Sequence, residues 1–123
     1  MNIPDSSIYT ANKYCKNPPT ITICGSVKYA KEAVIAENAL VAAGWCALGY
    51  TTPLTLLGQD EDIDDDMKKL YDEVHDKKIR MSIAVYVVNK DGYIGKSVRR
   101  EIEYAKSIGK DIYYMEDDRV DNQ

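Results

Sequence analysis

The chain has 123 residues, of which 45% are hydrophobic and 29% are charged, and its formal net charge at pH 7 is -4. This length supports one domain with a core, and the acidic balance argues against a nucleic-acid polymer or an anionic membrane surface as partner. No apolar run reaches the roughly 20 residues of a membrane span, and the first residues lack a signal-peptide pattern, so we expect a cytoplasmic protein without membrane contact.

The cysteines and the histidine indicate the kind of site to expect. Cys15, Cys24 and Cys46 are odd in number and form no CxxC pair. Cys24 and Cys46 lie in apolar runs, which predicts buried, reduced thiols. Because His75 is the single histidine, a zinc cluster of cysteines and histidines is not expected, and we predict neither a metal site nor a cofactor.

The first half of the chain predicts an arm followed by a strand, a helix and a strand. Residues 1–19 are polar and end in two prolines, so we expect an N-terminal arm before a single domain over residues 20–123. The β-branched run at 20–24 predicts a strand. Ser26 is a good helix cap, apolar residues then recur at helical spacing, and Gly44 supplies a stop. Residues 45–51 predict the second strand.

The second half repeats this alternation. The acidic run at 60–66 is interpreted as solvated carboxylates before a helix start rather than as a metal site. The second helix follows from apolar spacing at Met67, Leu70, Tyr71, Val74, Lys78 and Met81. Residues 84–89 form a continuous apolar strand, a third helix carries Val98 and Ile102, and residues 111–116 form the last strand.

Alternating strands and helices predict right-handed crossovers and a parallel sheet. The fold class is therefore α/β, a small Rossmann-like or flavodoxin-like three-layer sandwich with a four- to five-stranded parallel sheet. Ligands of such sheets bind outside the carboxyl ends of the strands. This rule selects three loops, at residues 24–27, 50–57 and 89–97.

The third loop contains "GYIGKS", which loosely resembles a phosphate-binding loop. A P-loop requires GxxxxGK[ST], and its first glycine is absent here. Backbone N–H groups at the helix start, with Lys96 beside them, still predict an anion site. The alternative is that Gly92 and Gly95 only shape a turn and that Ser97 only caps the helix.

Glu101 stands out on the third helix. At about 100° per residue, it lies about 60° from Val98, on the flank of the apolar stripe, one turn from the ligand edge. Burial raises the pKa of a carboxylate, whereas a helix start and nearby cations lower it. This balance suits a nucleophile or an electrostatic stabiliser. The alternative is a flank glutamate paired with Lys96 or an arginine.

The segments "ITICGSVKYA" and "DGYIGKSVRREIEYAKSIGKDIYYM" resemble the nucleoside 2-deoxyribosyltransferase superfamily, in particular its short bacterial and phage branch with a GYIGxSTxxEIxYA motif. The likeness covers residues 20–115. It implies cleavage or exchange of the N-glycosidic bond of a nucleotide or nucleoside, with Glu101 as the nucleophile. Together with the strand-end rule, it predicts this substrate-binding set: Cys24, Gly25, Ser26, Asn89, Gly92, Tyr93, Gly95, Lys96 and Ser97.

The partner of the leaving base is less evident, and His75 is the predicted catalytic candidate, with Asp72 and Asp76 as neighbours. Well-studied transferases carry an aspartate for the sugar 5′ hydroxyl where this chain has Gly95, which favours a 5′-phosphate. Arg80 and Ile83 replace acidic residues of related proteins. The alternative function is therefore a module that binds a nucleotide, to sense or sequester it, without turnover.

The aromatic composition predicts assembly. The chain has ten tyrosines and no phenylalanine, and tyrosine is enriched where a surface is half buried against a partner. Tyr50, Tyr71, Tyr86 and Tyr93 are expected near the ligand edge. We predict a homodimer or higher homo-oligomer whose neighbour helps to close each site, as the resemblance also implies. The alternative is that tyrosine replaces phenylalanine in an ordinary core.

Overall fold

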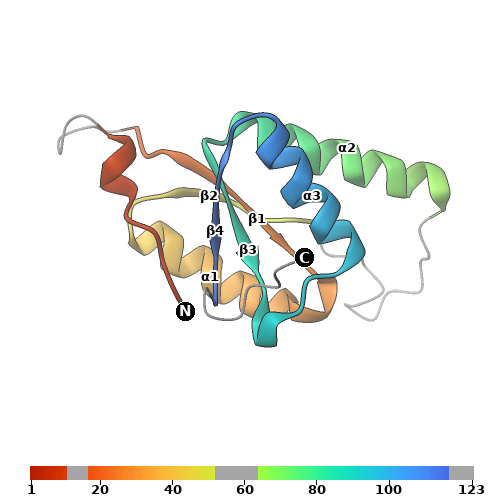
Figure 1. The fold of residues 1–123 in the computed structure, drawn as a ribbon, viewed down its shortest axis with the longest axis horizontal. Coiled ribbons are helices and arrows are strands. Elements are labelled where there is room, and N and C mark those ends of the chain that lie inside the picture. Colours follow the sequence, from red (N-terminus) through yellow and green to blue (C-terminus); the bar gives the residue numbers. More distant parts are fainter. Residues whose placement is uncertain (11–16, 52–63, 117–123) are drawn as a thin grey trace.

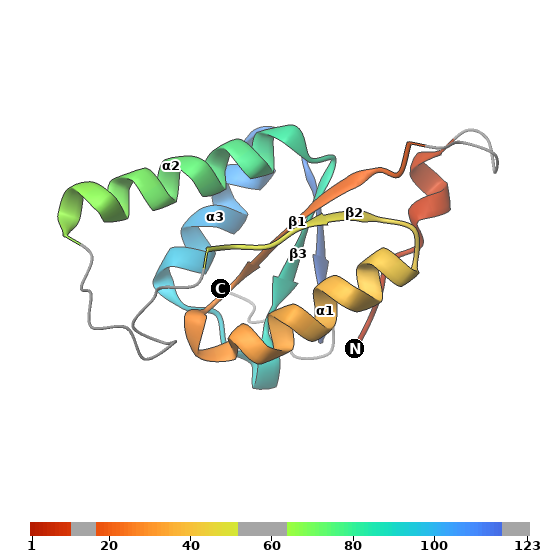
Figure 2. The same cartoon turned by 180° about the vertical axis from the view of Figure 1, so that it is seen from behind.

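The computed structural model describes residues 1–10, 17–51 and 64–116, and these form a three-layer α/β sandwich (Figures 1 and 2). This confirms the predicted fold class, with four strands in the described sheet. The parallel strands follow the order β2 (Cys46–Leu48), β1 (Thr20–Gly25), β3 (Ala84–Val88) and β4 (Asp111–Tyr114). Helix α1 (Ala30–Ala42) covers one face, and α2 (Asp65–Met81) and α3 (Lys96–Ser107) cover the other.

The strand order creates a switch point between β1 and β3. From β1 the chain passes through α1 to β2 on one side, whereas β3 pairs with β1 on the other side. The register places Gly25 beside Val88, so both strands end at the same edge. Ligands of parallel sheets bind at such an edge.

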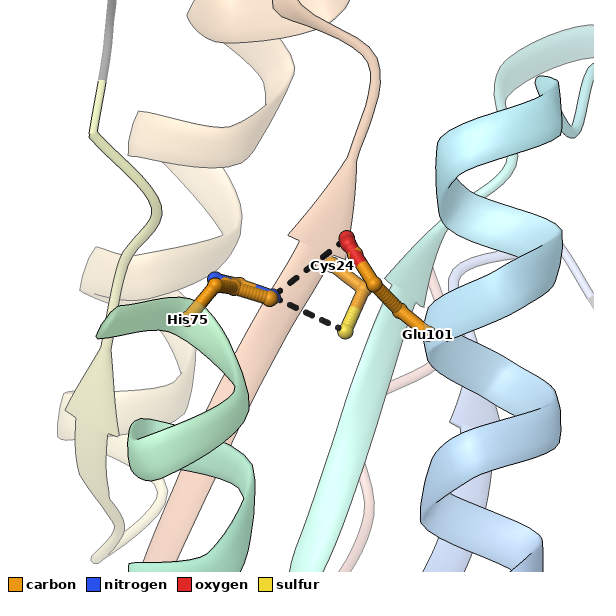
Figure 3. Close-up of side chains that lie close together, drawn as sticks. All are labelled: Cys24, His75 and Glu101. Atoms are coloured by element: carbon orange, nitrogen blue, oxygen red, sulfur yellow. Dashed lines mark hydrogen bonds and ion pairs between the residues drawn. The ribbon is translucent and has the colours of Figure 1, made fainter. Parts of the chain in front are cut away.

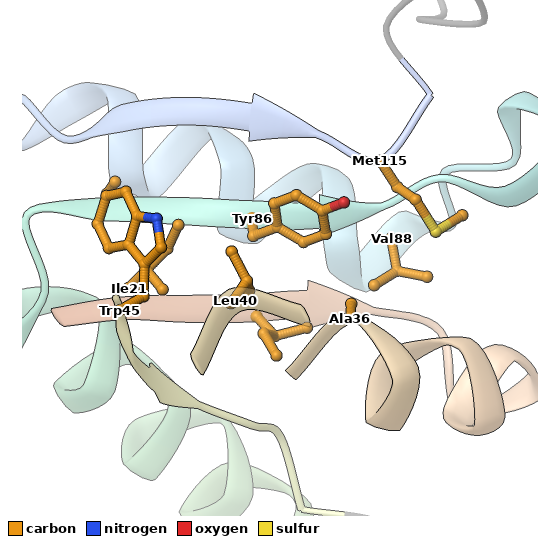
Figure 4. Packing of buried hydrophobic residues seen from close by; sticks show 9 residues of the cluster. Ile21, Ala36, Leu40, Trp45, Tyr86, Val88 and Met115 are labelled. Atoms are coloured by element: carbon orange, nitrogen blue, oxygen red, sulfur yellow. The ribbon is translucent and has the colours of Figure 1, made fainter. Parts of the chain in front are cut away.

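Alternating strand residues build a core on each side of the sheet. The cluster under α1 contains Ile21, Ile23, Ala36, Leu40, Trp45, Ala84, Tyr86, Val88 and Met115 (Figure 4). The cluster under α2 and α3 contains Cys24, Ile79, Val85, Val87, Val98, Ile102 and Ala105. Because strand side chains alternate between faces, Cys24 points towards α2 and α3.

The first helix begins later than predicted. Ser26 caps a 3₁₀ turn, η2 (Val27–Tyr29), by accepting the N–H of Lys28 at 3.3 Å. Helix α1 then starts at Ala30. Gly44 adopts a φ of 93° just after the helix, as expected for a C-terminal stop.

Strands β2, β3 and β4 are shorter than predicted at their carboxyl ends, whereas β1 extends one residue further, to Gly25. After β2, the carbonyl of Gly49 accepts a hydrogen bond from Lys78 Nζ at 2.8 Å. After β3, the Asn89 side chain bonds the N–H and the C=O of Glu116, at 2.9 and 3.0 Å. These side chains satisfy backbone groups that strand pairing would otherwise use. The prediction that Cys46 is buried is wrong, because β2 lies at the sheet edge and leaves this side chain exposed.

Residues 1–10 lie against the domain, whereas the sequence predicted an arm. Their 3₁₀ turn is η1 (Ser6–Tyr9). Tyr86 Oη donates to the Asn2 carbonyl at 2.6 Å, and Trp45 Nε1 donates to the Pro4 carbonyl at 3.0 Å. Ile3 and Tyr9 pack on the cluster under α1. Polar groups of the core thus find partners in this segment.

Helix α2 packs on the domain through a different face from the one that its apolar repeat predicted. Asp64 caps it by accepting the Met67 N–H at 2.8 Å, as expected for the acidic residues before this helix. Its buried side chains are His75 and Ile79. Four members of the predicted repeat are exposed, namely Met67, Leu70, Val74 and Met81. The helix was predicted correctly, but its contact face is set by packing on β1 and α3.

Candidate active site

Two adjoining hollows open at the carboxyl edge of β1 and β3. The first, here called the glutamate hollow, has a volume of about 170 Å³ and is lined by Gly25, Val27, Tyr50, Thr51, Lys68, Tyr71, Asp72, His75, Lys78, Ser97 and Glu101. The second, here called the helix-end hollow, has a volume of about 250 Å³ and is lined by Gly25, Ser26, Val27, Tyr93, Gly95, Lys96, Ser97 and Val98. Gly25, Val27 and Ser97 line both hollows and form their common wall, so the two hollows adjoin.

Glu101 is buried in the wall of the glutamate hollow. It is 9% exposed, close to the value for Ile102, although its helical angle predicted only a flank position. Burial raises the pKa of Glu101 to about 7, and the Arg100 guanidinium opposes this shift. Arg100 itself pairs with Asp76, at 3.1 Å. Glu103 points to solvent, as the helical angle predicted.

His75 faces Glu101 from α2 (Figure 3). Its Nε2 lies 3.4 Å from Glu101 Oε1 and 3.4 Å from Cys24 Sγ. Burial, followed by the nearby Lys78 charge, lowers the pKa of His75 to about 4, so the imidazole is neutral at pH 7. Its buried Nδ1 has no hydrogen-bond partner among the described residues.

Cys24 lies beneath this pair at the end of β1 and is fully buried. Burial, and then the Glu101 charge, raise the pKa of the Cys24 thiol well above its usual value. A protonated, buried thiol is a poor nucleophile. Cys24 lines neither hollow, so its contact with Glu101 and His75 replaces the substrate contact predicted for it.

Gly25 and Tyr50 shape the common wall. A Cβ atom at Gly25 would lie 3.1 Å from Val88 Cβ and 3.2 Å from the Tyr50 ring, so a larger residue would displace this ring. Tyr50 Oη donates to the Ser26 carbonyl at 2.9 Å. Burial, with Glu101 as the next cause, raises the pKa of Tyr50 to about 12, so this hydroxyl stays protonated.

The helix-end hollow lies against the start of α3. Gly95 is the N-cap and offers no side chain, and the first turn contains no acidic residue. The first N–H groups of α3 therefore have no side-chain cap at the point where the helix start lines the hollow. Such uncapped N–H groups favour the binding of an anion. Ser97 follows the cap by two positions, so it does not perform the capping role considered for it. Lys28 Nζ lies 4.1 Å from the centre of the Tyr93 ring and adds positive charge.

Besides Cys24, three residues that were predicted near the ligand lie outside the hollows. The Asn89 side chain is fully buried and bonds the Glu116 backbone, so it is not available as a substrate contact. Gly92 belongs to the turn η4 (Lys90–Gly92) and has a φ of 79°, which supports a turn-forming role. Tyr86 was expected near the ligand edge, but it is fully buried in the core under α1.

The neighbours of His75 on α2 divide into two groups. Asp72 lines the glutamate hollow, whereas Asp76 pairs with Arg100. Sequence reasoning missed Lys68 and Lys78, which also line this hollow. Their spacing from His75, seven residues before and three after, places them on one helix face and could have identified them.

Arg80 and Ile83 lie at the other end of the sheet, before β3 begins. Arg80 donates to Tyr104 Oη at 3.0 Å, and the Ile83 N–H donates to the Thr20 carbonyl at 3.0 Å. Neither residue lines the glutamate hollow or the helix-end hollow. The absence of acidic residues at these two positions therefore gives no support to a site that binds without turnover.

Comparisons of the chain with protein-family models, with curated proteins and with solved structures found no match. In the described part of the chain, no helix is long and apolar enough to cross a membrane. The functional conclusion therefore depends on the side chains that line the two hollows.

Proposed function

We propose that this protein cleaves or exchanges the N-glycosidic bond of a nucleotide, with Glu101 as the nucleophile. The observation that carries this proposal is a buried carboxylate in a hollow that shares a wall with the uncapped start of α3. A nucleotide has matching parts, because its anomeric carbon lies between a base and a phosphate. The resemblance to nucleoside 2-deoxyribosyltransferases supports the same assignment.

The reaction follows the pattern of a retaining glycosidase. A carboxylate oxygen of Glu101 attacks C1′, and the C1′–N bond breaks, with its electron pair leaving on the base. The product is a glycosyl ester of Glu101. Water or a second base then attacks C1′, which releases the sugar and restores the carboxylate.

The leaving base needs a proton or a hydrogen bond, and we assign this role to Asp72. Its carboxyl group lines the same hollow as Glu101. His75 suits a different role, because its low pKa leaves it neutral and its Nε2 faces Glu101. We propose that His75 positions the nucleophile by its close contact with Glu101, which revises its predicted part as an acid towards the base.

The helix-end hollow is proposed to take the 5′-phosphate. Ser97, Lys96 and the first N–H groups of α3 supply donors and positive charge there. Gly95 leaves room where transferases specific for nucleosides carry an aspartate. An anion at this position would also stabilise α3, because it would offset the partial positive charge of a helix start that lacks an acidic side chain.

We also propose that the protein acts as a cytoplasmic homo-oligomer. The unpaired thiols of Cys24 and Cys46 suit a reducing compartment. Exposed Leu70 and Val74 lie on α2, next to the helix face that lines the glutamate hollow. A neighbouring subunit on this stripe would cover apolar area and restrict water at the site.

Release of free base from a panel of nucleoside 5′-monophosphates, in ribose and deoxyribose forms, tests the proposed function. The wild-type protein should release base from at least one nucleotide, and Glu101→Gln should reduce the rate on the order of 10³-fold or more. The matched control is Glu103→Gln, two residues along the same helix and exposed, which should retain the rate.

Two results would refute this function. Equal losses in the Glu101 and Glu103 variants would show that the carboxylate at position 101 has no special role. Nucleotide binding without base release by the wild-type protein would instead support the binding module. Calorimetric titration of the same nucleotides separates these cases, because it detects binding in the absence of turnover.

A further inference from the structure

Cys24, His75 and Glu101 bring three metal-binding groups together from β1, α2 and α3 (Figure 3). A thiol sulfur, an imidazole nitrogen and a carboxylate oxygen all lie within 4.8 Å of one another. Each residue is at most 9% exposed. The three positions are far apart in the sequence, so no short motif reveals this cluster.

Two of the three distances between these groups match those around a shared metal ion. Zinc lies roughly 2.0–2.3 Å from nitrogen, oxygen and sulfur ligands, so two ligands of a tetrahedral site are roughly 3.3–3.6 Å apart. His75 Nε2 lies 3.4 Å from both Cys24 Sγ and Glu101 Oε1. A good N–H···O bond is shorter, at about 2.9 Å. The imidazole nitrogen thus lies between two potential ligands, in a hydrogen bond to the Cys24 sulfur and at a long distance from the Glu101 carboxylate.

We propose that Cys24 Sγ, His75 Nε2 and the Glu101 carboxylate bind a zinc ion. Glu101 and His75 line the glutamate hollow, so the fourth position of the ion faces this hollow and takes water or a substrate group. Three protein ligands with one open position are typical of accessible zinc sites. A ligand set with sulfur and imidazole selects zinc over magnesium or calcium.

Charge balance supports this assignment. A zinc ion carries two positive charges, and one thiolate with one carboxylate offsets both. A neutral imidazole with its proton on Nδ1 offers the Nε2 lone pair to the metal. Binding displaces the thiol proton of Cys24 to solvent, since a coordinating thiol is deprotonated. The buried cluster is then close to neutral with the ion bound.

The metal site has a consequence that rests on the proposed function. A zinc ion held by Glu101 occupies the carboxylate that would attack C1′. Zinc should therefore inhibit turnover reversibly, and a chelator should restore it. The existence of the site does not depend on the function, because it follows from the three side chains alone.

Cobalt absorption tests the site directly, because Co²⁺ replaces zinc and is coloured. In a Cys15→Ser, Cys46→Ser protein, Cys24 is the single cysteine. Addition of Co²⁺ should give a thiolate-to-cobalt charge-transfer band and the strong visible bands of a four-coordinate ion at one ion per chain. Further substitution of Cys24→Ala should abolish the charge-transfer band. If the Cys15→Ser, Cys46→Ser protein with Co²⁺ shows only the weak spectrum of the aqueous ion, the proposal is overturned.

Affinity measurements identify the other two ligands. In competition with a coloured chelator, His75→Gln and Glu101→Gln should each weaken zinc binding by more than about tenfold. Glu103→Gln is the matched control and should bind zinc like the parent. Circular dichroism verifies that each variant is folded. Unchanged affinity in both folded ligand variants would overturn the proposal.

The metal site and the function can fail separately. A four-coordinate cobalt spectrum without base release by the chelator-treated protein supports the site and contradicts the function. Base release by that protein without the cobalt spectrum supports the function and contradicts the site. Where both are found, one equivalent of zinc should suppress base release, and undiminished release would contradict the inhibitory effect.

Discussion

Glu101 and His75 are shifted in opposite directions by the same burial. The pKa of Glu101 rises to about 7, and that of His75 falls to about 4. Each shift favours the neutral form, because a low-dielectric site penalises charge. A substrate that brings positive charge to C1′ in its transition state would favour the ionised form of Glu101. With a pKa of about 7, Glu101 is ionised in part near neutral pH, and its ionised form is reached at little cost.

The pH dependence of the reaction follows from this shift. Only the carboxylate form of Glu101 can attack, so kcat/KM should rise with pH around a midpoint near 7 and then level off. Arg100→Gln should move this rise to higher pH, because the Arg100 charge lowers the pKa of Glu101. Steady-state rates in a chelator, measured from pH 5 to 9, provide the test.

A nucleoside serves as the control substrate, because a 5′-phosphate titrates near pH 6 and would add its own step. The same rise near pH 7 should appear with the nucleoside, at lower overall efficiency. A rise centred near 4.5, the ordinary value for glutamate, would contradict the proposed burial of the nucleophile.

Among the elements, α2 and α3 begin in contrasting ways. Helix α2 has Asp64 as its cap and two further aspartates in its first turn. Helix α3 begins at Gly95 without a side-chain cap and without acidic residues. Acidic side chains satisfy the positive end of α2, whereas the end of α3 remains available to a ligand anion. This difference places the proposed phosphate at α3.

Ser97→Ala tests the phosphate assignment. The variant should weaken binding of a 5′-monophosphate by about 1–2 kcal/mol, or roughly 5- to 30-fold, through loss of a hydrogen bond to a charged group. The matching nucleoside should bind almost as before. The control is Ser107→Ala at the other end of α3, where the hydroxyl donates to the Tyr104 carbonyl. Equal weakening of both ligands by Ser97→Ala would contradict a phosphate contact.

The order of strands and helices was predictable from the sequence, whereas the packing of α2 was not. Repeats of apolar residues predicted each helix, and short β-branched runs predicted the strands. The repeat in α2 contains Leu70 and Val74, yet the buried residues are His75 and Ile79. Periodicity identifies an apolar face but does not indicate whether the domain or a partner covers it.

The site was predictable to the extent that it is local in sequence. The stretch from Gly95 to Glu101 carried the prediction of the helix start and of a carboxylate on the flank of the apolar stripe, which the structure buries more deeply. The contacts of Asn89 and Cys24 were not readable, because they join residues 27 and 51 positions away. Such tertiary contacts decide whether a polar side chain supports the fold or faces a ligand.

On the scale of the whole molecule, the exposed stripe of α2 predicts self-association. Static light scattering at micromolar concentration should give a mass at least twice 13.9 kDa. Leu70→Asp places a charge on this stripe and should shift the protein towards the monomer. Ile8, an exposed apolar residue of the first 3₁₀ turn, is the control position, and Ile8→Asp should leave the mass unchanged. A fully active 13.9 kDa monomer would contradict this prediction.

The polar site of the domain lies at the carboxyl edge of the sheet, and the two apolar clusters lie on the two faces of the sheet. Residues 1–10 complete the cluster under α1, on the opposite face of the sheet from Glu101. Substitutions in this segment should therefore change the free energy of unfolding, although the segment does not touch the reacting groups. The central claim concerns the other face, where Glu101 is proposed to bond covalently to the sugar.

Mass spectrometry of the trapped protein tests this claim most directly. A 2′-fluoro analogue of the nucleotide slows both steps, because fluorine destabilises an oxocarbenium-like transition state, so that a glycosyl-enzyme accumulates. The account predicts a mass increase of one fluorinated sugar phosphate, located on the peptide that contains Glu101. The adduct should persist in Glu103→Gln and be absent in Glu101→Gln. Base release without any adduct, or an adduct retained in Glu101→Gln, would contradict the account.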